Sequence, residues 1–245
     1  MEAPVDTATP KLTGLDLVRL TRGLSCVFWG VPMSLLFCIQ LLIAHIVVTD
    51  PFIRGSLAQL YFVLFFAVLA VACAGTYWLQ QVEGIGSDWR RRARVCMASA
   101  VSALYFTPFL YWWQNMPEET TYTLNLFGLI LSAIVLLGAL NALCMELGRF
   151  LGDRSLRRES RVFLALIALV LGAPALYAFW WAVASSLREG SNENLGLAFL
   201  NIFRLPYHIR LTLFIVLFLP VALTLANLWR VKEMMLEEMK KLTIP

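Results

Sequence analysis

The chain has 245 residues, of which 60% are apolar and 15% are charged, and its mean hydropathy is +0.72. Soluble domains carry charges on about a quarter of their residues, so this composition excludes an ordinary soluble protein. The net charge of +4 is better explained by arginines that orient membrane spans beside anionic lipid headgroups than by a nucleic-acid partner.

Six apolar stretches are each long enough to cross the roughly 30 Å hydrocarbon layer as a helix of about 20 residues. They cover residues 24–48, 57–80, 95–113, 122–145, 162–185 and 209–229. Strands of a membrane barrel would instead alternate in polarity over about ten residues, and these stretches do not. The sequence therefore predicts an all-α fold, a polytopic integral membrane protein with a six-transmembrane-helix bundle.

The spans occupy most of the chain, which predicts one membrane domain at 24–230. Residues 1–23 are expected to form a cytoplasmic tail and an amphipathic interfacial helix, although a simple solvated lead-in is equally compatible with the pattern. The start of the chain lacks the order of regions found in a signal peptide, so the first span is expected to serve as an uncleaved anchor. Residues 231–245 are predicted to form a cytoplasmic C-terminal helix.

The densest charge lies at 88–94, between the second and third spans. Short loops rich in arginine stay in the cytoplasm, because moving them across a bilayer is costly. A second basic segment follows the fourth span. We predict that the arginines of both segments fix topology and contact anionic headgroups: Arg90, Arg91, Arg92, Arg94, Arg154, Arg157, Arg158 and Arg161.

The remaining charges test this orientation. With both termini in the cytoplasm, all but four of the 20 Lys and Arg residues lie inside, the exceptions being Arg54, Arg188, Arg204 and Arg210. The sequence thus predicts a protein of the plasma membrane, or bacterial inner membrane, with its N-terminus and C-terminus both cytoplasmic.

Two features of the outer half leave alternatives open. Spans one, three and five each contain a proline and spans three and five end in paired tryptophans, which three tandem hairpins would explain, as would shared composition. The apolar segment 195–206 is too short to span, so it is either a re-entrant gate or a helix lying on the headgroups.

Polar side chains are rare inside the spans, and no ionisable residue lies near a span centre. Amides and hydroxyls there usually form hydrogen bonds between helices worth about 1 kcal/mol, and substrate contact is the alternative. The residues concerned are Gln40, Thr107, Asn141, Thr224 and Asn227. The five cysteines lie in or beside apolar stretches without metal-site spacing and are interpreted as small apolar residues.

Residues that could hold a cofactor or perform catalysis are few. His45 and His208 are the only histidines and lie near the outer ends of their spans, so they are either haem ligands or, more commonly, interfacial anchors. No cofactor or metal is otherwise implied. Glu146 and Arg149 have the i, i+3 spacing of a helical ion pair, and no hydrolase motif is present. We assign no catalytic residue, and an enzyme is not favoured.

The C-terminal segment 228–242 has a helical apolar stripe. It consists of Leu228, Val231, Met235, Met239 and Leu242. Such a stripe either binds a cytoplasmic partner or lies on the inner leaflet.

These features favour a transport- or channel-type subunit that acts as a homo-oligomer or with other membrane subunits. The layout of six spans, a lead-in helix and a non-spanning segment before the last span resembles that of ABC-2-type permeases, in layout alone and without a coupling motif. A non-catalytic structural or assembly subunit is the alternative. A haem-binding or lipid-handling membrane enzyme is a third hypothesis.

Overall fold

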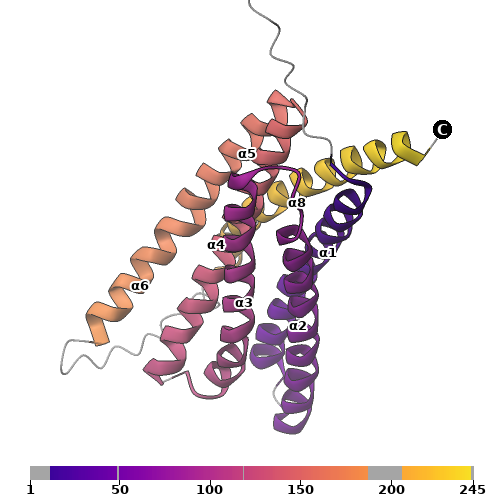
Figure 1. Ribbon diagram of the computed structural model, residues 1–245. Helices are drawn as coiled ribbons and strands as arrows, with labels where there is room; N and C mark the ends of the chain where they lie inside the picture. The colour runs from indigo at the N-terminus through magenta and orange to yellow at the C-terminus, as the bar shows by residue number, and fades with distance from the viewer. Residues whose placement is uncertain (1–11, 49, 118, 187–205, 244–245) are drawn as a thin grey trace, which may run out of the picture.

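The computed structural model describes residues 12–48, 50–117, 119–186 and 206–243. Within these ranges the regular structure is entirely helical, which confirms the predicted all-α fold class. Figure 1 shows the helices in chain order: α1 (Gly14–Val47), α2 (Pro51–Gln80), α3 (Ser87–Asn115), α4 (Thr120–Phe150), α5 (Arg154–Ile167), the π-helical turn η1 (Ala168–Gly172), α6 (Ala173–Ser186) and α8 (Tyr207–Thr243).

The described ranges hold six helices that are long and apolar enough to cross a membrane, as predicted. The fifth is formed by α5, η1 and α6 in succession. Pro174 lies just after η1, and because proline lacks an N–H and its ring crowds the preceding turn, a π-helical turn lets the helix continue past it. The predicted segment 195–206 lies outside the described residues.

The helices extend well beyond the apolar stretches. Residues 88–94 were expected in a loop, but they form the first two turns of α3, and the connection from α2 is only residues 81–86. The arginines after the fourth span likewise belong to α5, which follows a three-residue turn. Gly86 and Gly152, with φ of 125° and 71°, make the two connections in a conformation that favours glycine. Hydropathy marks the part of a helix that meets hydrocarbon and not the part that continues into headgroups.

The first helix has no break at residue 23, where the interfacial segment was expected to end. Thr13 caps α1 by accepting a hydrogen bond from the backbone N–H of Asp16, and the helix then continues to Val47. In the same way α8 continues from its apolar part into the predicted C-terminal helix, and reaches about 55 Å at 1.5 Å per residue.

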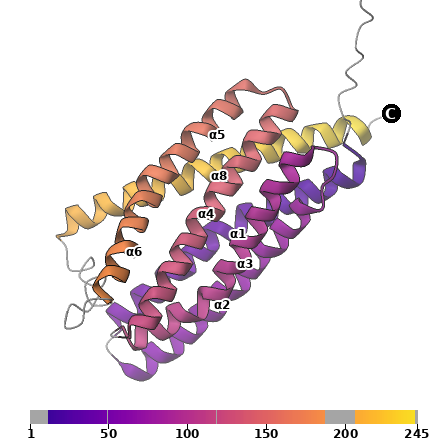
Figure 2. The ribbon, with the colours of Figure 1, turned by 60° about the vertical axis from the view of Figure 1, so that its left-hand side comes forward.

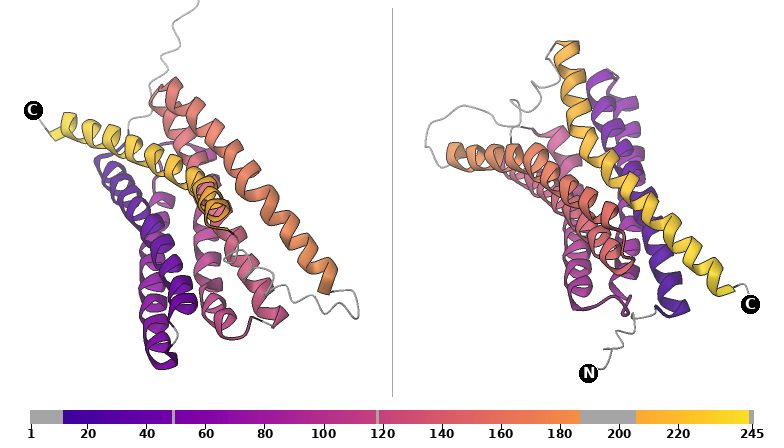
Figure 3. Two further views of the ribbon diagram at one scale, coloured as in Figure 1. Left: turned by 180° about the vertical axis from the view of Figure 1, so that it is seen from behind. Right: turned by 90° about the horizontal axis from the view of Figure 1, so that it is seen from above.

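The helices pack as two antiparallel pairs with further helices against them. Helix α1 pairs with α2 and α3 with α4, while α5 and α6 lie along the other side of α4 (Figures 1 and 2). Helix α8 crosses the bundle obliquely and contacts α1, α4 and α5 (Figure 3). The start of α1, the end of α8 and both arginine-rich segments lie at one end of the bundle, hereafter the charged end.

Helices α1 and α2 approach each other closely at small residues. A Cβ on Gly75 would lie 2.8 Å from the Cβ of Cys26 and 2.9 Å from the carbonyl oxygen of Gly23, and a Cβ on Gly30 would lie 2.8 Å from that of Ala72. Small residues are common where membrane helices touch, because they let backbones come together and maximise van der Waals contact.

Two apolar clusters fill the bundle. At the charged end, Leu20 and Leu24 of α1 pack with Leu147 of α4 and with Val231 and Met235 of α8. Toward the other end, α1, α2, α3 and α4 contribute to a second cluster, in which Trp113 is the largest side chain. The C-terminal half of α8 is therefore part of the core of its own chain.

The close contact at Gly75 predicts that Gly75→Ala destabilises the chain by about 1 to 3 kcal/mol, because the added methyl has no room. Gly55→Ala is the matched control, since it lies in the same helix and a Cβ there meets nothing within 4 Å. Unfolding in mixed detergent micelles, followed by circular dichroism, measures both. Equal stability of the two variants would contradict the packing described here.

Candidate functional site

The side chains of the first two turns of α3 go to different places. Trp89 is buried, and its indole N–H donates to the carbonyl of Leu79 over 3.1 Å, which ties the start of α3 to the end of α2. Arg90 makes an exposed ion pair of 3.6 Å with Glu83. Arg91 and Arg94 are exposed. Of the four arginines in these turns, only Arg92 reaches into the bundle.

Arg92 forms an ion pair with Glu146 of α4, with 2.8 Å between Nη2 and Oε1. Its Nη1 also donates to the carbonyl of Ala142 over 3.0 Å. The side chain of Glu146 is only 7% exposed, so its charge depends on these partners. Arg149 approaches the same carboxylate at 3.4 Å, which is the i, i+3 contact expected from the sequence.

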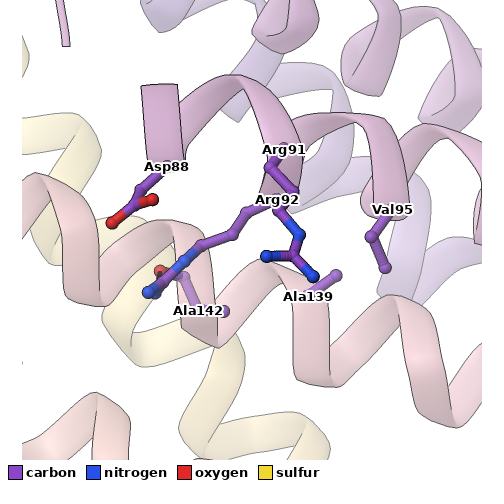
Figure 4. Close-up of a pocket in the computed structure, with 6 residues that line it drawn as sticks. All are labelled: Asp88, Arg91, Arg92, Val95, Ala139 and Ala142. Carbon is purple, nitrogen blue, oxygen red and sulfur yellow. Dashed lines mark hydrogen bonds between the residues drawn. The ribbon is translucent and has the colours of Figure 1, made fainter. Parts of the chain in front are cut away.

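A pocket of about 460 Å³ lies beside this ion pair, between α3 and α4 (Figure 4). Its lining consists of Asp88, Arg91, Arg92, Val95, Ala139 and Ala142. The arginines and Asp88 stand on the α3 side, while the two alanines leave room on the α4 side (Figure 4). The pocket thus combines two guanidinium groups, one carboxylate and small apolar side chains.

The second basic segment is more exposed. Arg154, Arg157, Arg158 and Arg161 all lie on α5 with exposed side chains. They do not line the pocket. Their predicted contact with lipid headgroups stays a prediction, as it does for the arginines of α3.

Helix α8 is fastened to α5 by Arg230. Its Nη2 lies 2.8 Å from Asp153, the N-cap residue of α5, and its Nη1 lies 3.1 Å from Glu159. The pKa of Asp153 is lowered, first because its carboxylate accepts a hydrogen bond from the backbone N–H of Leu156 and further because Arg230 is adjacent. Asp153 therefore stays ionised, and the ion pair persists, at pH values down to below the usual range of an aspartate.

Deeper in the bundle, four polar side chains from three helices meet. The amide nitrogen of Asn141 donates to Thr224 over 2.7 Å, and that of Asn227 donates to Ser160 over 3.2 Å and to Asn141 over 3.4 Å. All four are at most 2% exposed. This polar network joins α4, α5 and α8, so three of the predicted intramembrane polar residues, Asn141, Thr224 and Asn227, hydrogen-bond between helices.

The other two do not join a network. The hydroxyl of Thr107 donates to the carbonyl of Ala103 within its own helix, at 2.8 Å. Gln40 is half-buried on α1.

The two histidines lie near helix ends away from the charged end. His208 is exposed in the first turn of α8, and His45 belongs to the last turn of α1, where its side chain lies outside the described part of the structure. Haem ligation by this pair stays a prediction. Among the described residues, no three His, Cys, Asp or Glu side chains gather where they could hold a metal ion.

The apolar stripe of the C-terminal segment is largely used inside the chain. Leu228, Val231 and Met235 are buried, and Met239 packs against the same cluster. A cytoplasmic partner bound through 228–242 stays a prediction, and it would have to use side chains other than these three.

Sequence reasoning missed the partner of Glu146 and the role of Ser160. Glu146 was paired with Arg149 from spacing alone, whereas Arg92, 54 positions earlier, makes the shorter contact. The available signal was a carboxylate directly after an apolar stretch, because such a group needs a cation from a neighbouring helix. Nothing local distinguishes Ser160 from other serines at helix ends.

Comparisons with protein-family models, with curated proteins and with solved structures found no match.

The ion pair predicts that Arg92→Gln lowers the free energy of unfolding by about 2 kcal/mol, because it removes the cation closest to the buried carboxylate of Glu146. Arg94→Gln removes the same charge two residues later from an exposed position, and we expect a change of about 0.5 kcal/mol or less. Mixed-micelle unfolding compares them.

The double variant Arg92→Gln/Glu146→Gln provides the control. If the two residues are coupled, it costs less than the sum of the single variants. Additive effects would show that the contact contributes nothing specific.

Proposed function

We propose that the chain is a transport- or channel-type membrane subunit that acts as a homo-oligomer or with other membrane proteins. The observation that carries this proposal is the exposure of the fifth long helix. In its most apolar 18-residue stretch only 6% of the residues are buried, against 50% in α4. A helix with so few contacts inside its own chain has most of its surface available for a neighbour.

The exposed surface has a defined position. Leu176 and Trp180 of α6 are exposed, and so are Ile215 and Leu219 in the first half of α8. Helix α8 contacts α5 and η1, but it diverges from α6 away from the charged end (Figure 3). Among the described residues no helix covers these apolar side chains at the divergence, so they offer contacts to a partner helix or an apolar substrate.

The interior of the bundle favours a substrate path between neighbouring chains and not a path through the middle of one chain. Its apolar clusters are closely packed, and the buried amides of Asn141 and Asn227 are occupied by each other and by neighbouring hydroxyls. These amides are therefore not available to replace the hydration shell of a polar substrate without breaking the network.

We further propose that the charged end faces the cytoplasm of a plasma or bacterial inner membrane. Both arginine-rich segments, the start of α1 and the end of α8 lie at this end, as the positive-inside rule requires. Anionic headgroups of the inner leaflet would then surround the exposed arginines.

The second candidate is a structural or assembly subunit. Two observations favour it: Glu146 is paired with Arg92, and the side chains of the polar network hydrogen-bond to one another. A packing subunit needs no free polar group in the membrane. It shares with the first candidate the requirement for neighbouring chains.

Cysteine cross-linking in native membranes tests the shared requirement. We expect Leu176→Cys on α6 to give cross-linked species, and Val101→Cys, exposed on α3, to give none above the parent chain with its native cysteines. Purification in native lipid then separates the roles: a co-purifying ATPase favours transport, and a fixed set of other membrane subunits favours assembly. A monomer without cross-links or companions would refute both.

Labelling with an impermeant thiol reagent tests the orientation. Ser87 begins α3 at the charged end and Thr120 begins α4 at the other, and both are exposed. In intact cells we expect Thr120→Cys to be modified and Ser87→Cys to be spared until the membrane is permeabilised. The reverse pattern would show that the charged end faces outward.

A further inference from the structure

We propose that the pocket between α3 and α4 is a binding site for the headgroup of a phospholipid, in which Arg91 and Arg92 bind the phosphodiester and Asp88 accepts a hydrogen bond from a headgroup hydroxyl or ammonium. This goes beyond the proposed function, because the site is formed by this chain alone and requires no transport activity.

The position of the pocket along α3 suits a headgroup. The helix has 29 residues and is about 43 Å long, whereas the hydrocarbon layer is about 30 Å thick. If α3 is centred in the bilayer, its first four or five residues lie beyond the hydrocarbon. Arg91 and Arg92 are its fifth and sixth residues, so they stand at the edge of the hydrocarbon, from which long side chains reach the lipid phosphates.

The charges fit a single phosphodiester. Arg92 is held in place by Glu146 and by the carbonyl of Ala142, so its guanidinium is pre-oriented and still has N–H groups to donate. Arg149 lies 4.0 Å from Asp88 and 3.4 Å from Glu146. Within the described residues Arg91 has no carboxylate partner, so it supplies the one uncompensated positive charge at the pocket.

The presence of Asp88 narrows the ligand. Arg149, 4.0 Å away, offsets the charge of Asp88, and the Asp88 carboxylate can still accept a hydrogen bond from a donor on the headgroup. Glycerol and ethanolamine headgroups carry such a donor next to the phosphodiester, whereas choline does not. The uncompensated charge of Arg91 favours the anionic glycerol headgroup of phosphatidylglycerol.

Apolar surface continues from the pocket toward the membrane interior. Val95 stands one turn after Arg91 and is 46% exposed, and Ala139 and Ala142 face it with only methyl groups. Val135, one turn before Ala139 on α4, continues this surface with an exposed side chain. Acyl chains attached to a headgroup in the pocket can therefore follow the surface of these two helices, which a soluble phosphate cannot do.

Native mass spectrometry of the purified chain in detergent, titrated with phosphatidylglycerol, tests the site. We expect Arg91→Gln to weaken binding about 10-fold, the effect of losing one charge-assisted contact. Arg94→Gln is the matched control, because it removes an equal charge from the same exposed side of α3 without touching the pocket. We expect a change of less than about 2-fold there.

A second variant separates shape from charge. Ala142→Leu keeps every charge and the backbone carbonyl but fills the pocket, and we expect it to weaken binding as much as Arg91→Gln does. Equal effects of the two arginine variants, or full binding by a folded Ala142→Leu chain, would overturn the pocket in favour of diffuse attraction.

Competition separates lipid from free anion. We expect phosphatidylcholine to bind more weakly than phosphatidylglycerol, and inorganic phosphate at the concentration of the lipid to leave the bound lipid in place. Displacement by inorganic phosphate at that concentration would assign the pocket to a soluble anion and refute the lipid site.

Discussion

The contact between Arg92 and Glu146 determines how the charged end is built. A carboxylate buried at the end of a membrane helix is costly to ionise unless a cation is fixed beside it. Arg92 meets this need by crossing from α3 to α4, where it forms an ion pair with Glu146 and donates a hydrogen bond to the carbonyl of Ala142. The same bonds hold its guanidinium at the edge of the pocket, so one interaction both joins two helices and prepares a surface for an anion.

Three sets of contacts attach helix α8 to the bundle, and all of them lie in its C-terminal half. The polar network joins it to α4 and α5 through Asn227, the ion pairs of Arg230 fasten it to the start of α5, and its apolar stripe packs on α1. Its first half lacks comparable contacts and exposes apolar side chains such as Ile215 and Leu219. Within the described residues, α8 is thus joined to the bundle through its C-terminal half, and its first half offers apolar side chains to neighbouring molecules.

Much of the architecture followed from composition. The number of membrane-length helices, their order and the all-helical class are consequences of six apolar stretches, since a backbone in hydrocarbon must satisfy its own hydrogen bonds. The arginines gather at one end because the two basic segments are separated by two spans, which return the chain to the same end of the bundle. Hydropathy did not predict where the helices end, because α3 and α5 include the charged residues that follow or precede the apolar stretches. Their starts lie next to Gly86 and Gly152, whose positive φ turns the chain.

The sequence by itself determined which residues were polar inside the membrane, but not which of them would meet. Asn141 and Asn227 were both identified, yet their contact with each other and with Ser160 depends on the oblique path of α8 across α4 and α5. The pocket likewise depends on Ala139 and Ala142 facing Arg91 and Arg92 from another helix. Residue type sets what a side chain needs, whereas helix packing decides which partner supplies it, because partners between helices are far apart in the chain.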